Sequence, residues 1–158
     1  MRGAMGSAVT GFVADGKVLR YEGDGIDWAI TPERILSVGE ATIDSPVSGE
    51  DWLLCFVTDL HGNWLEGSLY APGRNAALHW LSVHLESSFE VKLANAPGFR
   101  SRVMWPPRIR EQPFFLYQVS PLRRLLSRSL HRLGFPPPDG VQSVHPAVLD
   151  YLRGQRRR

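Results

Sequence analysis

Short runs of apolar residues, many of them alternating with polar ones, fill the first half of the chain and predict strands with one buried face. The dipeptide Asp15-Gly16 separates two such runs. Aspartate followed by glycine suits the positive φ angles of a tight turn, so we expect a hairpin at this point. The first strand would then bring Phe12 and Val13 close to Val18 and Leu19.

The most apolar segment is 52–57, with the sequence Trp-Leu-Leu-Cys-Phe-Val. A continuous apolar run of this length is typical of a central strand that is buried on both faces. The same setting predicts that Cys55 is a core residue, because a reactive thiolate needs electropositive and partly open surroundings. Loop residues 60–63 follow and predict a hairpin that returns through Trp64.

Helical spacing of apolar residues occurs in three later segments. In 72–87, leucines at 78, 81 and 85 share one helical face. Leucines also recur along 121–133, after a Ser-Pro start and before a glycine stop. A third and shorter helix is expected at 146–153, because a proline suits its first turn.

Strands are expected between these helices as well. Apolar and polar residues alternate in 89–93 and again in 99–105, which predicts two half-exposed strands. Residues 114–119 predict a further strand. Together with the first half, they indicate an α+β protein, a mostly antiparallel meander of short strands packed with helices.

The order of elements from about Gly11 to Glu86, several short strands followed by an amphipathic helix, resembles that of the pleckstrin-homology-like barrel. The resemblance implies an alternative fold, a bent barrel with a helix at one open end and a C-terminal extension. The chain length of 158 residues matches one domain. We assign it to 9–158, with a basic helical segment from 120 onward and with residues 1–8 as a flexible N-terminus or expression remnant.

The single cysteine and the hydropathy of the chain predict the cellular compartment of the protein and whether it crosses a membrane. A lone cysteine forms no internal disulfide, which favours a reducing compartment and a cytoplasmic location. No run reaches the roughly 18 apolar residues that a membrane-spanning helix needs, so we expect no transmembrane segment. The N-terminus also lacks the charged and then apolar layout of a signal peptide.

Few residue patterns carry chemistry. A hairpin tip with Asp59 and His61, together with nearby Glu66, is the nearest approach to a catalytic cluster, because it could present an acid and an imidazole together. Turn formation alone also explains this loop. His79 and His84 are five residues apart and cannot form an i, i+4 metal pair. With no glycine-rich phosphate loop either, we expect neither a cofactor nor a metal.

Charge is distributed unevenly. Residues 1–99 carry 6 basic and 13 acidic side chains, a net −7, whereas residues 100–158 carry 12 arginines and 3 acids, a net +9. Such asymmetry points to an anionic partner or to self-association. The arginines of 121–133 are the candidate partner-binding residues, since guanidinium favours bidentate contact with carboxylate or phosphate: Arg123, Arg124, Arg128 and Arg132. Pairing with the acidic first half, or solvation, explains them equally well.

The leading hypothesis is a non-catalytic binding or protein-interaction module whose basic C-terminal segment meets an acidic protein surface or a second copy in a homodimer. Nucleic-acid binding ranks lower, because no binding module accompanies the charge. The alternative is a small enzyme with a pocket near Asp59, His61 and Glu66.

Overall fold

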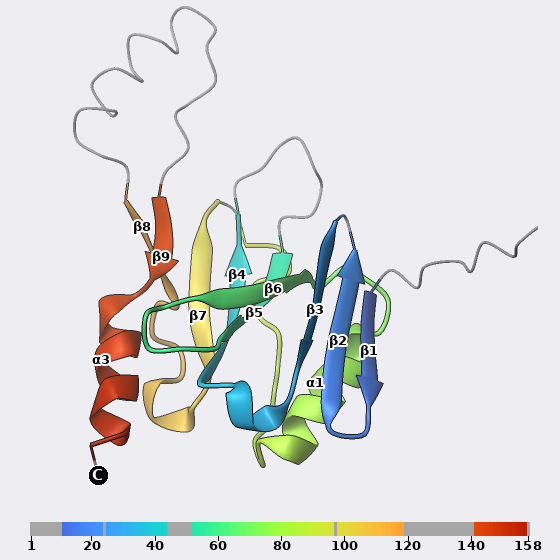
Figure 1. Cartoon of the computed structure of the whole chain (residues 1–158). Coiled ribbons are helices and arrows are strands. Elements are labelled where there is room, and N and C mark those ends of the chain that lie inside the picture. The colour runs from blue at the N-terminus through green and yellow to red at the C-terminus, as the bar shows by residue number, and fades with distance from the viewer. Residues whose placement is uncertain (1–10, 24, 44–51, 97, 119–140, 158) are drawn as a thin grey trace, which may run out of the picture.

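The computed structural model describes residues 11–23, 25–43, 52–96, 98–118 and 141–157. Their strands are all antiparallel to their neighbours and form three sheets, to which two helices are added (Figure 1). The expected α+β class is therefore confirmed. The pleckstrin-homology-like arrangement is not, since the described strands divide among three sheets and do not form one bent barrel. Neither described helix is long and apolar enough to cross a membrane.

The first sheet contains β1 (Gly11–Asp15), β2 (Val18–Gly23) and β3 (Ile26–Ile30) in that order. The expected hairpin is present, but its pairing differs from the expectation, because Phe12 lies opposite Tyr21. The reason is that Asp15 and Val18 form the closing pair, which places Gly16, with a φ of 53°, inside the turn. The closing pair sets the register of the whole hairpin, because every further pair is counted outward from it.

The second sheet has the order β6-β5-β4-β7. Its strands are β4 (Ser37–Thr42), β5 (Trp52–Val57), β6 (Trp64–Ser68) and β7 (Arg100–Trp105). Every residue of β5 is buried, as its apolar run predicted. Alternate side chains enter two different cores: Leu54 and Phe56 pack toward the first sheet, whereas Leu53 and Cys55 pack on the opposite face.

The first core lies between the two larger sheets and is closed by α1 (Arg74–His84). This helix confirms the one expected over 72–87. It packs against β1 and buries Ala77, Trp80 and Leu81. Gly73 precedes it with a φ of 81°, and a Cβ atom there would lie 1.9 Å from the carbonyl oxygen of Phe12. Only glycine allows the chain to pass so close to β1.

The second core lies on the other face of the second sheet. It is covered by a two-stranded sheet, β8 (Phe115–Gln118) with β9 (Val141–Val144), and by α3 (Pro146–Gln155). The helix expected at 146–153 is thus confirmed and continues for two further residues. The helix expected at 121–133 lies outside the described residues.

Segment 89–93 is not a strand, so that prediction is wrong. In the described part of the chain, this segment joins neither outer edge of the second sheet, at β6 or at β7. The alternation does indicate which side chains face the interior, because Phe89, Val91 and Leu93 are partly buried against the first core. Side chains of the second sheet, rather than a neighbouring strand, bind the backbone of this segment, as described below.

Candidate functional site

The hairpin tip predicted as a catalytic candidate is organised by Asp59. Its carboxylate accepts hydrogen bonds from the backbone N–H of His61 at 2.8 Å and of Asn63 at 3.1 Å, and from the side-chain amide of Asn63 at 2.6 Å. The hydrogen bond from the Asn63 side chain is the main reason that the pKa of Asp59 is lowered. The carboxylate therefore stabilises the turn, as aspartate commonly does.

Glu66 does not line a described pocket together with Asp59 or His61. Its carboxylate accepts a hydrogen bond from Trp64 Nε1 at 3.0 Å, and Glu66 lines a recess with residues of β3. His61 is exposed. Neither Asp59 nor His61 lines any of the three concave sites described here. Catalysis at this hairpin stays a prediction.

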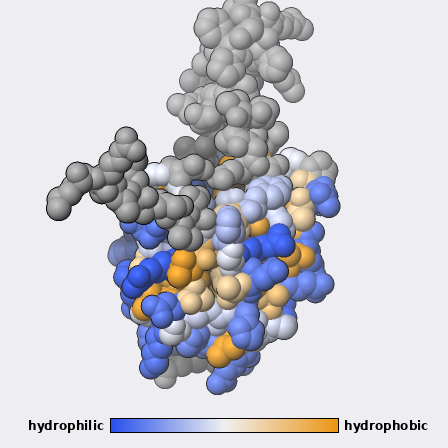
Figure 2. All heavy atoms as spheres, turned by 90° about the vertical axis from the view of Figure 1, so that its right-hand side faces the viewer, coloured by the Kyte–Doolittle hydropathy of each residue, from blue (hydrophilic) through white to orange (hydrophobic). Residues whose placement is uncertain are grey.

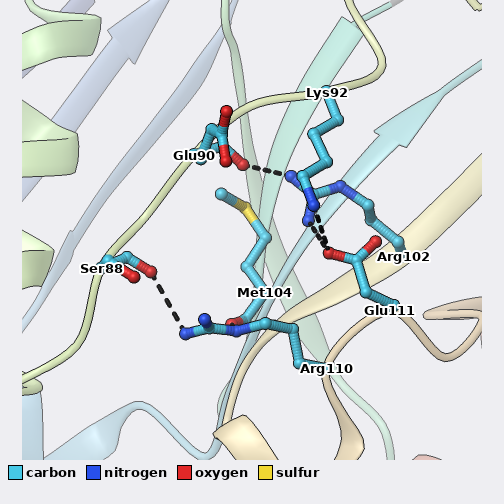
Figure 3. A pocket seen from close by; sticks show the side chains of 7 residues that line it. All are labelled: Ser88, Glu90, Lys92, Arg102, Met104, Arg110 and Glu111. Carbon is cyan, nitrogen blue, oxygen red and sulfur yellow. Dashed lines mark hydrogen bonds and ion pairs between the residues drawn. The ribbon is translucent and has the colours of Figure 1, made fainter.

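A small charged cavity of about 50 Å³ lies between segment 87–93 and the second sheet (Figure 3). Its charged groups bond mainly to one another or to backbone. Glu111 Oε1 accepts from Lys92 Nζ at 2.9 Å and from Arg102 Nη1 at 3.0 Å. Arg110 donates to the carbonyl of Met104 and to the hydroxyl of Ser87. The cavity is large enough for about one to three waters.

Beneath this cavity, the fully buried carboxylate of Glu40 holds segment 87–93 in place. It accepts hydrogen bonds from the backbone N–H of Lys92 at 3.0 Å and of Leu93 at 2.8 Å. Arg102 donates to the same carboxylate and to the carbonyl of Glu90. We call this arrangement the Glu40 clamp. Its groups satisfy one another inside the protein, so we assign it a structural role.

An apolar groove of about 310 Å³ lies next to α3 and is here called the α3 groove. It is lined by residues from four separate parts of the chain: Ile35, Leu36, Leu60, Trp105, Pro106, Tyr151, Leu152, Gln155 and Arg156. The apolar residues form most of its surface, while α3 supplies the polar groups along one side. An apolar cavity with a few polar groups, at the lower end of the usual size range, is typical of a binding site.

Arg156 lines the α3 groove, and three further exposed arginines lie within two residues of a lining residue in the sequence. Arg34 directly precedes the lining residue Ile35, and Arg108 follows the lining residue Pro106 by two positions. Arg156 lines the groove itself, and Arg157 comes next in the chain. Among the described residues, none of these four arginines forms an ion pair, whereas Arg153 on the same helix pairs with Asp150 at 3.5 Å. The groove thus combines an apolar floor with the positive charge of Arg156, and further arginines are close to it in the sequence.

The remaining candidates do not form a site in the part of the chain that the structure describes. No group of three metal-ligating side chains occurs there. The face that carries β1 and α1 shows apolar residues only in small groups between hydrophilic ones (Figure 2), as is normal for protein surfaces. Arg123, Arg124, Arg128 and Arg132 lie outside the described residues.

Comparisons with known proteins give no family for the chain: no family model matches it, and neither a curated protein nor a solved structure is significantly similar to it.

Sequence reasoning missed the α3 groove because its lining residues are scattered from 35 to 156. One signal did point to it, namely the arginines that close the chain. No local pattern reveals that Ile35 and Pro106, which are close in sequence to Arg34 and Arg108, line the same groove as Arg156.

Proposed function

We propose that the protein is a non-catalytic interaction module that binds an acidic segment of a partner protein in the α3 groove. The observation that supports the proposal is the apolar groove lined by Arg156, with exposed Arg34, Arg108 and Arg157 close to lining residues in the sequence. An apolar side chain of the partner would occupy the groove, and carboxylates on either side of it would meet the guanidinium groups. The proposal retains the cytoplasmic location expected from the single cysteine.

Charge and shape favour an acidic protein segment over the other anionic partners. Guanidinium groups bind carboxylates with bidentate geometry, and an apolar groove gives affinity to a side chain but none to a phosphate backbone. The binding energy should come mainly from the buried apolar side chain, because exposed charge pairs contribute little individually. The arginines would chiefly provide selectivity and fast association.

The test is a binding titration with a labelled synthetic peptide in which glutamates surround a single phenylalanine. Fluorescence anisotropy of the label measures its affinity for the full-length protein. Replacing the phenylalanine by serine should weaken binding by about tenfold or more, and Arg34→Gln combined with Arg156→Gln should weaken it by about threefold to tenfold. The matched control is Lys17→Gln with Arg20→Gln, which removes two exposed cations from the first hairpin and should change the affinity by less than about twofold.

Three results would overturn the proposal. Equal weakening by both double variants would mean that only net charge matters. Tighter binding of duplex DNA, with an affinity that falls steeply as salt rises from about 0.05 to 0.2 M, would indicate nucleic acid as the partner. A dimer seen by sedimentation in the absence of peptide, and abolished by Arg34→Gln with Arg156→Gln, would replace the partner by a second copy of the chain.

A further inference from the structure

The outer edges of β3 and β6 face a recess that the proposed function does not use. β3 ends the three-stranded sheet and β6 ends the four-stranded one, and no described strand pairs with either outer edge. The two strands lie near each other in Figure 1, and Trp28 Nε1 of β3 donates to the carbonyl of Glu66 in β6 at 2.8 Å. The recess between them has a volume of about 460 Å³ and is lined by 25–28 and 64–66. We call it the strand-edge recess.

The backbone of β6 leaves unpaired positions on the recess side. On the side of β5, the backbone carbonyl of Asn63 accepts a hydrogen bond from the N–H of Thr58, and the N–H of Leu69 donates to the carbonyl of Trp52. Backbone groups of an antiparallel strand alternate in direction, so the odd-numbered residues of this segment bond toward β5 and the even-numbered ones point away from it.

Two of these outward groups already have partners. The carbonyl of Glu66 accepts from Trp28, and the N–H of Ser68 donates to the hydroxyl of Tyr21. Alternation directs the N–H of Glu66 and both backbone groups of Trp64 toward the recess side. A short stretch of strand edge is therefore presented for pairing.

The side chains around this edge are apolar and acidic. Ile26 is 43% exposed, and Trp64 and Leu65 are half-buried. Asp27 and Glu66 supply two carboxylates, and none of the described residues that line the recess is a lysine or an arginine. The local charge is therefore opposite to that of the α3 groove, so the two sites should prefer different partners.

We infer that the strand-edge recess is a docking site for an extended segment of a partner protein in which basic and apolar residues alternate. The segment adds to β6 as a further strand, with backbone hydrogen bonds to Trp64 and Glu66. Its apolar side chains contact Ile26 and Leu65, and its lysines or arginines meet Asp27 and Glu66. The charge of the recess selects basic over acidic segments, and its open strand edge selects extended backbone.

The experiment titrates the full-length protein with a labelled synthetic peptide of alternating lysine and valine and follows fluorescence anisotropy. The decisive comparison uses a second peptide with the same side chains but with N-methyl groups on the amides of one edge. If the segment pairs with β6, N-methylation should reduce the affinity by about tenfold or more. Unchanged affinity of the N-methylated peptide would overturn the inference, whatever the protein variants show.

Charge is tested by Asp27→Asn combined with Glu66→Gln, which keeps the side-chain shapes and should also weaken binding about tenfold. The matched control is Asp15→Asn with Asp150→Asn, which removes the same charge elsewhere and should bind normally. Equal weakening by both pairs would overturn the charge selection. Thermal melts confirm that each variant is folded, and the control keeps its first hairpin because asparagine followed by glycine is also a good turn sequence.

Amide hydrogen exchange locates the bound peptide. Binding should slow exchange at the N–H groups of Trp64 and Glu66, while Arg34→Gln with Arg156→Gln should leave the affinity for the basic peptide unchanged. Protection confined to the α3 groove would overturn the inference. A peptide-independent dimer that protects the same two N–H groups would also overturn it, since a second copy would then be the natural occupant.

Discussion

Glu40 and Arg102 lie directly opposite each other on β4 and β7 and form an ion pair inside the first core. Arg102 Nη2 is 2.7 Å from Glu40 Oε2, and the two side chains are 8% and 0% exposed, with Glu40 the more deeply buried. The indole of Trp52 donates to the other carboxylate oxygen at 2.7 Å. Two buried charges are thereby compensated by each other and by neutral donors, which is the condition under which a protein interior tolerates them.

Removing one partner of this pair should therefore be costly. Glu40→Gln keeps the shape of the side chain but leaves the buried Arg102 guanidinium with only the half-exposed Glu111 as a counter-charge, so we expect a loss of about 3 kcal/mol in the free energy of unfolding. Urea denaturation followed by tryptophan fluorescence measures the loss. Glu90→Gln is the matched control, because that side chain is exposed and only the backbone carbonyl of Glu90 contacts Arg102. A Glu40→Gln variant as stable as the control would contradict the structural role of the clamp.

Glu111 gives the stability of the protein a dependence on pH. Its hydrogen bond from Lys92, aided by the nearby Arg102 charge, lowers the pKa of the Glu111 carboxyl below the ordinary 4.5. A lowered pKa in the folded state means that the stabilisation is present above the unfolded pKa and is lost as the pH falls through the folded value.

Glu111→Gln should remove this contribution. The variant should be less stable than the natural protein at neutral pH, and the difference should shrink as the pH is lowered below 4.5, because protonation then removes the same charge from both unfolded and folded wild-type chains. Urea midpoints measured at several pH values provide the comparison. A difference that stays constant with pH would show that Glu111 acts through shape and not through its charge.

The elements predicted correctly from the sequence are those in which burial follows the chain locally. The apolar run of β5 and the leucine face of α1 belong to this group, since the spacing of apolar residues within one segment indicates which of its side chains are buried. Segment 89–93 has the alternation of a strand, but pairing is a long-range property. The buried carboxylate of Glu40 instead accepts hydrogen bonds from the backbone of segment 89–93. Nothing near Glu40 in the sequence indicates this.

The candidate sites were less predictable for the same reason. The function of Asp59 as a turn acceptor was one of the two interpretations that the local sequence allowed, and the structure supports it. The α3 groove and the strand-edge recess, by contrast, combine side chains from distant turns and strand ends. The strand-edge recess depends on which strands end the sheets, a matter of topology that no spacing of residues encodes.

Cys55 should be unreactive in the folded protein. It is fully buried in the second core, and burial raises the pKa of its thiol well above the usual value, with the nearby Glu66 charge acting in the same direction. Because the thiolate is the reactive form, a disulfide-exchange reagent should label Cys55 only at the rate of unfolding. Absorbance of the released thiol, followed with and without urea, tests this. Rapid labelling without denaturant would contradict its place in the core.

Two glycine-to-alanine substitutions should change stability in opposite directions. Gly39 lies on β4 beneath the fully buried ring of Phe114, and a Cβ atom there would lie 2.2 Å from Phe114 Cδ2. Because the ring cannot leave a packed core, Gly39→Ala should lower the free energy of unfolding by about 1–3 kcal/mol. Gly154 is exposed on α3, where an added Cβ atom meets nothing within 4 Å.

Gly154→Ala should instead raise the free energy of unfolding by up to about 1 kcal/mol, since alanine favours the helix more than glycine does. Urea denaturation of both variants gives the two values under the same conditions. The pair separates packing from helix propensity, because the chemical change is identical and only the surroundings differ. A Gly39→Ala variant as stable as the natural protein would mean that the second sheet and the two-stranded sheet of β8 and β9 can move apart, and that Phe114 does not fix the spacing between them.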